Sequence, residues 1–337
     1  MPRDDKPVEA AELREHMRSR AGLILLGGLG AAIVAGAQGP PHGGPGFNLT
    51  VASTHRLDLG GTTLQVDFAE GATDLAPEAI LDHVNKAGKA VATYYGKFPV
   101  AGARVLIVPV ANESGILQGT TWGGMRGWPA FTRVRIGQHT TQAELDEDWM
   151  MTHELVHMAF PSLPDDQHWM EEGLSTYIEP VARVQTGEMK PEQIWRDMVR
   201  DMGKGQPRDG DKGIDNTHTW GRTYWGGALF CLVADVAIRR ETHNKKGLQD
   251  ALRAIVNQQG TINHDWDLPK ALAMGDVATG THVLMRQYEE WKDKPVTVDL
   301  AALWADLGIT AMNGGVAFDD AAAGAAIRNE ITKASNH

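Results

Sequence analysis

The pentapeptide His153-Glu154-Leu155-Val156-His157 constrains the fold of this 337-residue chain more than any other feature. Thr141 and Glu144 have the spacing of a capping box, which predicts a helix that begins there, continues through the pentapeptide and ends near Pro161. Residues four apart lie on the same face of a helix, so the two imidazoles can converge on one metal ion. Glu154 lies about 100° around the helix, where it can accept a proton from an attacking water.

The pentapeptide also fits two surface histidines on an amphipathic helix, unless a third ligand follows. The stretch after His168 predicts a second helix, from near Asp166 to about Ile178 and ending before Pro180. A carboxylate on this helix would complete a His₂Glu site, and zinc sites with three protein ligands keep a fourth position for water. A structural zinc site fits less well, because such sites usually have four ligands, commonly cysteines, and this chain has one cysteine. We therefore expect one catalytic Zn²⁺ per chain.

Two further segments resemble a known family. Trp169-Met170-Glu171-Glu172-Gly173 and Tyr224-Trp225-Gly226-Gly227-Ala228 are similar to the W-x-x-E-G and Y-x-x-G-A segments of the gluzincin peptidases, the clan of aminopeptidase N and the glycyl aminopeptidases. The resemblance implies that Glu172 is the third ligand, with Glu171 as the alternative, and that Tyr224 hydrogen-bonds the developing oxyanion. A buried aromatic residue at a helix start is the other interpretation of Tyr224. The resemblance spans roughly residues 95–307, but only these short segments are specific.

The resemblance also implies an α+β fold with a thermolysin-like catalytic unit, in which a mixed sheet lobe precedes a mainly helical lobe. The loop between His157 and Glu172 is shorter than in aminopeptidase N. Gly123-Gly124-Met125-Arg126-Gly127 is similar to a clan segment whose glutamate binds the free amino terminus of the substrate. Arg126 replaces that acid, which predicts weak aminopeptidase activity and a preference for internal bonds or acidic substrates. A glycine-rich turn without a substrate role is the alternative.

The hydrophobic periodicity divides the chain into two lobes. We expect a mixed α/β lobe over residues 48–140, a helical zinc-peptidase lobe over 141–318, and a C-terminal tail over 319–337. The first lobe should contain a hairpin around Gly60-Gly61, a helix from Pro77 to Tyr95, a strand over Val105–Val110 and an edge strand over Phe131–Ile136. In the second lobe, helices are predicted over Tyr224–Thr242, Gly247–Gln258, Gly280–Lys292 and Leu300–Leu307.

The N-terminal region is predicted to direct the chain out of the cytoplasm. Residues 21–37 are apolar, follow three arginines and end in an A-x-A pattern, so residues 1–37 form a signal peptide or a retained membrane anchor, with a linker over 38–47. A buried core helix is the remaining interpretation of this segment. The net charge of −11 and the pI near 5.6 argue against a nucleic-acid partner and leave a peptide or protein substrate.

A few other residues carry weaker predictions. Glu179 lies on the same helix face as Glu172 and would either accept an N–H from a ligand histidine or be solvated. Asp235 is expected to pair with Arg239 or Arg222, because it lies in an apolar helix. Cys231 is expected to be a small buried hydrophobe. Together the residues favour an extracytoplasmic zinc metallopeptidase, with a gluzincin-like peptide-binding module as the alternative.

Overall fold

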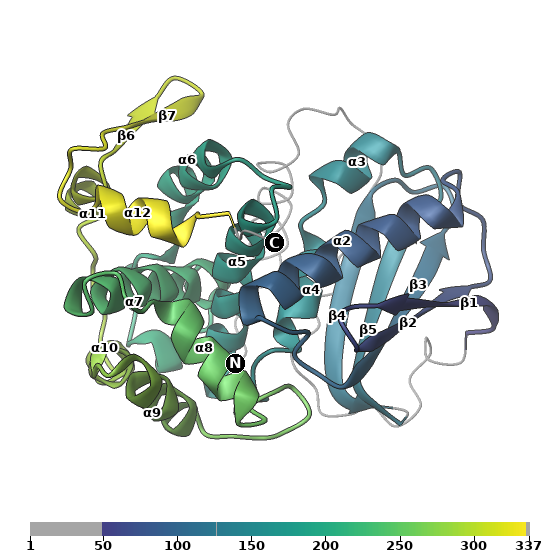
Figure 1. Ribbon diagram of the computed structural model, residues 1–337, viewed down its shortest axis with the longest axis horizontal. Helices are drawn as coiled ribbons and strands as arrows, with labels where there is room; N and C mark the ends of the chain where they lie inside the picture. The colour runs from purple at the N-terminus through teal and green to yellow at the C-terminus, as the bar shows by residue number, and fades with distance from the viewer. Residues whose placement is uncertain (1–48, 126, 335–337) are drawn as a thin grey trace.

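The computed structural model describes residues 49–125 and 127–334, in which one mixed sheet is followed by a mainly helical lobe (Figure 1). The sheet has five strands in the order β1-β2-β3-β5-β4, parallel between β2 and β3 and between β3 and β5, and antiparallel at both ends. Its strands are β1 (Val51–Asp58), β2 (Thr63–Ala69), β3 (Gly102–Val110), β4 (Ile116–Met125) and β5 (Trp128–Gly137). This arrangement confirms the α+β class.

Helix α2 (Pro77–Tyr95) lies across one face of the sheet (Figure 1). Its proline stands in the first turn, where no N–H is needed, and Gly96 ends it with a φ of 78°, a left-handed conformation that favours glycine. The apolar residues repeat at helical spacing and are all buried: Ile80, Val84, Ala87 and Val91. The predicted helix and the predicted β1–β2 hairpin are both confirmed.

The prediction that Phe131–Ile136 forms an edge strand is wrong. This segment belongs to β5, which lies between β3 and β4, and β4 forms the edge. The sequence of β4, ILQGTTWGGM, contains three glycines and two threonines, so it lacks the alternation that identifies a half-buried strand. The alternative that Gly123–Gly127 is a glycine-rich turn holds for Gly127, but Gly123 and Gly124 belong to this strand.

The pentapeptide lies on a helix, but that helix is shorter than predicted. The capping box of Thr141 and Glu144 begins α3 (Gln142–Glu147), and the chain then turns extended at Asp148 before α4 (Met150–His157) starts. The break arises because the Asp148 carboxylate accepts hydrogen bonds from the backbone N–H groups of Met150 and Met151, each at 3.0 Å. These bonds satisfy two of the N–H groups that the start of a helix leaves without an intrahelical partner.

Helix α5 (His168–Gln185) runs seven residues beyond the predicted end and contains Pro180. A proline inside a helix removes one backbone hydrogen bond, a cost that burial of nearly the whole helix offsets here. A 3₁₀ turn over Asp165–Gln167, η1, leads into it.

The remaining helical lobe follows in chain order. Its elements are α6 (Pro191–Asp201), η2 (Met202–Gly205), η3 (Ile214–Asn216), η4 (Gly221–Gly226), α7 (Gly227–Glu241), α8 (Leu248–Asn257), α9 (Leu268–Thr279), α10 (Val283–Trp291) and α11 (Leu300–Asp306). Helices α6 and α9 are additional to the sequence prediction. A two-stranded hairpin, β6 (Ile309–Met312) and β7 (Gly315–Phe318), extends from one end of this lobe (Figure 1).

The segment expected as a C-terminal tail contains helix α12 (Ala325–Ile331). Arg328 anchors this helix, since its side chain is 1% exposed and donates hydrogen bonds from Nη1 to the carbonyls of Leu307 and Gly308, both at 3.0 Å. No helix within residues 49–125 and 127–334 is long and apolar enough to cross a membrane. The predicted signal or anchor segment, residues 1–37, and the linker that follows it lie outside the described residues.

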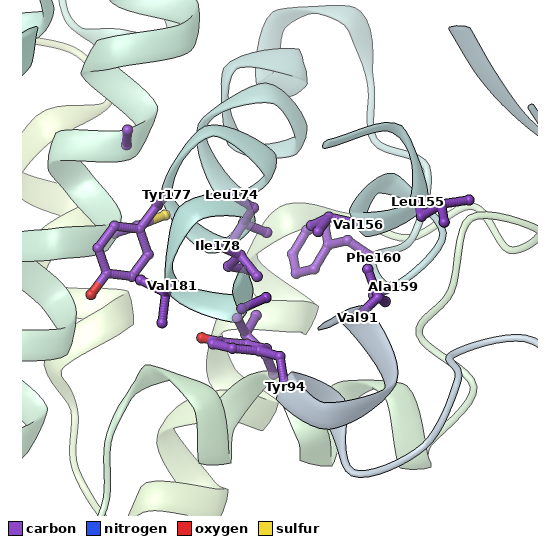
Figure 2. Close-up of a cluster of buried hydrophobic side chains, with 14 of the residues drawn as sticks. Val91, Tyr94, Leu155, Val156, Ala159, Phe160, Leu174, Tyr177, Ile178 and Val181 are labelled. Carbon is purple, nitrogen blue, oxygen red and sulfur yellow. The ribbon is translucent and has the colours of Figure 1, made fainter. Parts of the chain in front are cut away.

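The core that joins the two lobes surrounds α4 (Figure 2). Val91 and Tyr94 come from α2, Val156 and Phe160 come from α4 and the turn after it, and Leu174 and Ile178 come from α5. Burying a side chain of this size contributes about 1.5–3 kcal/mol. Helix α4 is therefore held in place by packing against both lobes, which compensates for its length of only two turns.

Candidate metal and catalytic site

Helix α4 presents the two predicted ligand histidines from inside the protein. His153 is 4% exposed and the His157 side chain is 13% exposed, so the interpretation as two surface histidines is excluded. Their rings lie 4.9 Å apart between centroids and are nearly perpendicular.

The Glu172 carboxylate reaches both histidines from the first turn of α5. Its Oε2 lies 3.1 Å from His153 Nε2 and 3.6 Å from His157 Nε2. Ligand atoms about 2.0–2.2 Å from a tetrahedral zinc ion lie about 3.3–3.6 Å apart, which is close to both separations. The three side chains thus have the chemistry of a His₂Glu zinc site, and the two separations from Glu172 Oε2 fit it.

The structure distinguishes Glu172 from Glu171, the alternative ligand. Glu171 Oε2 lies 2.8 Å from His168 Nδ1, and its Oε1 accepts a hydrogen bond from the backbone N–H of Leu163 at 3.2 Å. Glu172 Oε1 lies 3.2 Å from His168 Nε2. Glu172 therefore directs Oε2 towards the ligand histidines, and Glu171 is engaged by His168 and the loop before it.

Protonation equilibria in this cluster reflect burial and close pairing. Burial alone would raise the pKa of Glu172, but His157, His153 and His168 lower it well below its ordinary range. Burial would lower the pKa of His157, which the negative charge of Glu172 raises instead. Burial would likewise lower the pKa of His168, yet its hydrogen bonds to Glu171 and Glu172 raise it to about 10. Glu172 is thus ionised at neutral pH, as a metal ligand must be.

Glu154 lies beside the two histidines, and one ligand atom of each of the three residues lies within 4.8 Å of the others. Its Oε2 accepts a 2.8 Å hydrogen bond from Thr121 Oγ1 on the edge strand β4. Burial is the main reason that the pKa of Glu154 is raised, although both histidines oppose the shift. A carboxylate that Thr121 holds in place, with a raised pKa, suits a general base better than a metal ligand.

The edge strand approaches Glu154 closely at Gly119. A Cβ atom added at this glycine would lie 2.4 Å from Glu154 Cγ and 2.7 Å from its Cδ and Oε1. Only glycine therefore allows β4 to pass at this distance from α4.

Tyr224 lies in η4, a turn of π-helix that leads into α7, rather than in the first turn of the predicted α-helix. Its ring is 6.2 Å from the His153 ring and nearly parallel to it. π-Helical turns occur often at functional sites because they redirect side chains. The structure thus brings Tyr224 to His153 from a separate part of the helical lobe.

Two glycines, one in each segment that resembles the gluzincin peptidases, allow helices α5 and α7 to approach each other closely. A Cβ atom at Gly173 would lie 2.3 Å from the Cα of Gly227, and one at Gly227 would lie 2.2 Å from the carbonyl oxygen of Trp169. Helices α5 and α7 therefore cross in backbone contact, immediately after Glu172 and three residues after Tyr224. This crossing fixes the two functional side chains relative to each other.

Two tryptophans that the sequence analysis did not identify border the site. The Trp149 ring packs edge-on against His153 at 5.3 Å, and the Trp220 ring stacks on Tyr224 at 5.8 Å. Trp149 stands one turn before His153 on the helix, a spacing that could have suggested the contact. No sequence signal identified Thr121, because its strand was not recognised.

The residues with weaker predictions can also be compared with the structure. Glu179 is 1% exposed and accepts a 2.9 Å hydrogen bond from Arg183 Nη1, so it is not a solvated residue; its contact with a ligand histidine stays a prediction. Asp235 pairs with Arg239 as predicted, with Nε and Oδ1 2.9 Å apart. Cys231 is buried, as predicted, and burial raises the pKa of its thiol. Arg126 lies outside the described residues.

Comparison with known proteins bears on the fold. No protein-family model and no curated protein matches the sequence. Among solved structures, an aminopeptidase N family protein from Idiomarina loihiensis matches with a TM-score of 0.58 and 12% identity, over 77% of this chain and 49% of that one. The chain has an aminopeptidase N-like fold. An M1 zinc metallopeptidase from Deinococcus radiodurans matches with a TM-score of 0.48 and 16% identity, over 73% of this chain and 52% of its own. The chain thus spans about half the length of these structures.

Proposed function

We propose that this protein is a zinc-dependent peptidase in which His153, His157 and Glu172 bind one Zn²⁺. The observation that carries the proposal is the position of Glu172 Oε2, 3.1 Å and 3.6 Å from the two histidine Nε2 atoms. The fold supports it, because the solved structure that this chain resembles with a TM-score of 0.58 is an aminopeptidase N family protein. When bound, the ion would polarise both an attacking water and the scissile carbonyl.

Glu154 would then transfer the protons, and Tyr224 would stabilise the negative charge that develops on the substrate. Glu154, oriented by Thr121, accepts a proton from the attacking water and returns it to the leaving nitrogen. Its raised pKa brings its basicity closer to neutral pH, which favours both transfers. Tyr224 donates its phenolic O–H to the oxyanion that develops on the substrate carbonyl. Burial of His153, Glu154 and Glu172 strengthens these interactions.

The substrate would be a peptide or a protein, and the apolar N-terminal segment supports an extracytoplasmic location, either secreted or periplasmic. A membrane contact would come only from a retained N-terminal anchor. The acidic net charge of −11 argues against a nucleic-acid partner.

The test is to compare the native protein with Glu154→Gln. The amide keeps the shape of the carboxylate but cannot accept the proton. We therefore expect Glu154→Gln to keep one zinc per chain by elemental analysis and to lose most hydrolysis of a peptide library. Addition of a chelator should abolish hydrolysis by the native protein, and Zn²⁺ should restore it.

The complementary test removes one metal ligand and measures the zinc content. His153→Ala or His157→Ala should lose the bound zinc. A full equivalent of zinc in either variant would contradict the assignment of the site. Zinc binding by the native protein without any hydrolysis would instead indicate a gluzincin-like peptide-binding module.

A further inference from the structure

His168 is a histidine near the site to which neither the sequence pattern nor the proposed chemistry gives a role. It is the first residue of α5, and both of its ring nitrogens face carboxylate oxygens. Nδ1 lies 2.8 Å from Glu171 Oε2, and Nε2 lies 3.2 Å from Glu172 Oε1. The three residues stand at positions i, i+3 and i+4 of one helix, so the cluster forms within a single turn.

We propose that His168 is a positioning residue that fixes the Glu172 carboxylate so that only Oε2 is presented to the metal. This inference rests on the zinc site proposed above. An unrestrained glutamate could rotate about its terminal bond and offer either oxygen, or both. A hydrogen bond from His168 Nε2 to Oε1 removes that freedom and leaves Oε2 between His153 and His157.

The position of His168 is itself fixed from outside the cluster. Glu171 accepts from His168 Nδ1, and its second oxygen accepts from the backbone N–H of Leu163 in the loop between α4 and α5. The neighbouring Trp169 donates from Nε1 to Asp215 Oδ1 at 2.7 Å, which ties the first turn of α5 to η3. The hydrogen bonds therefore run from the loop through Glu171 and His168 to Glu172.

By its charge alone, His168 would weaken zinc binding. A cationic imidazole beside the site would repel a divalent metal, but the Glu171 carboxylate at 2.8 Å offsets its charge. Orientation of the ligand carboxylate is then the larger contribution. Groups that hydrogen-bond metal ligands typically change metal affinity by about 10–100-fold when they are removed.

The experiment measures zinc affinity by competition with a chromogenic chelator, together with the melting temperature of the metal-free protein. His168→Leu should weaken zinc binding by about 10–100-fold. The metal-free His168→Leu protein should stay folded at the temperature of the zinc measurement, which its melting temperature verifies. His168→Gln places an N–H donor near the original Nε2 without a positive charge, and it should restore most of the affinity.

His139 provides a matched control. Its Nδ1 lies 2.8 Å from Asp74 Oδ2, the same separation as in the His168–Glu171 pair, and it is remote in sequence from the ligands. His139→Leu should leave zinc affinity unchanged.

Unchanged zinc affinity in His168→Leu overturns the inference, whether or not the melting temperature falls. Equal losses in His168→Leu and His168→Gln also overturn it, because they show that an N–H donor at this position does not restore zinc affinity. If the native protein binds no zinc, the proposed function and this inference fail together. If the native protein binds zinc and the His168 variants bind it with the same affinity, this inference fails and the proposed function stands.

Discussion

The contact between Gly119 and Glu154 makes Gly119→Ala the sharpest test of how the general base is positioned. The added methyl would lie 2.4 Å from Glu154 Cγ, whereas ordinary van der Waals contact begins near 3.4 Å. Either the Glu154 side chain or strand β4 must therefore move by about 1 Å. Cγ is near the middle of the side chain, so rotation of the carboxylate alone cannot relieve the clash.

A displacement of about 1 Å from the productive geometry can reduce turnover by about 100-fold, which corresponds to about 2.7 kcal/mol of activation free energy. The three heavy atoms nearest to the added methyl all belong to Glu154 and none to a metal ligand, so zinc content should stay at the native level. The hydrogen bond from Thr121, two residues along the strand, would be strained by the same movement.

The assay measures kcat and zinc content of Gly119→Ala on the best substrate from the peptide library. Gly315→Ala is the matched control, since Gly315 is also a strand glycine and an added Cβ there meets no heavy atom within 4 Å. Native turnover in a folded, zinc-loaded Gly119→Ala protein would refute the argument that the edge strand positions Glu154. A fall of similar size in Gly315→Ala would show that the effect is not specific to the site.

Three other predictions follow from the same contacts. Tyr224→Phe should lower kcat by about 10²–10³-fold with little change in KM, as expected for one oxyanion donor, and native kcat would make Tyr224 a packing residue. Gly173→Ala should lower the free energy of unfolding by about 1–3 kcal/mol in a denaturant titration, because its Cβ would meet the Gly227 backbone at 2.3 Å; alanine in a helix without this clash would stabilise instead. Burial would raise the pKa of Asp148, but its hydrogen bonds from His83 and from the start of α4 lower it, so its stabilisation is present above about pH 4 and is lost as the pH falls through the folded-state pKa. The difference in unfolding free energy between the native protein and Asp148→Asn should therefore shrink in acid, and a difference that stays constant from pH 7 to pH 3 would exclude this account.

The sequence by itself determined the features that depend on local periodicity. The spacing of His153 and His157 placed both imidazoles on one helix face, and the apolar repeat of α2 located that helix to the residue. The presence of Asp235 in an apolar helix predicted its pairing with Arg239, because an unpaired buried carboxylate is costly. These inferences need only the geometry of one helix and the free energy of desolvation.

Only the tertiary structure decided the rest of the site. The choice between Glu171 and Glu172 depends on which carboxylate the α4 histidines face, and His168 engages both acids within the same turn. The edge strand could not be recognised, because a strand such as β4 is defined by its partner β5 and not by its own glycine-rich pattern. Gly119, Gly173 and Gly227 are ordinary glycines in the sequence, and their importance comes from backbones that meet only after folding. Contacts between distant segments have no periodicity to reveal them, and for this reason the hydrogen bond from Thr121 to Glu154 and the packing of Trp220 on Tyr224 required the structure.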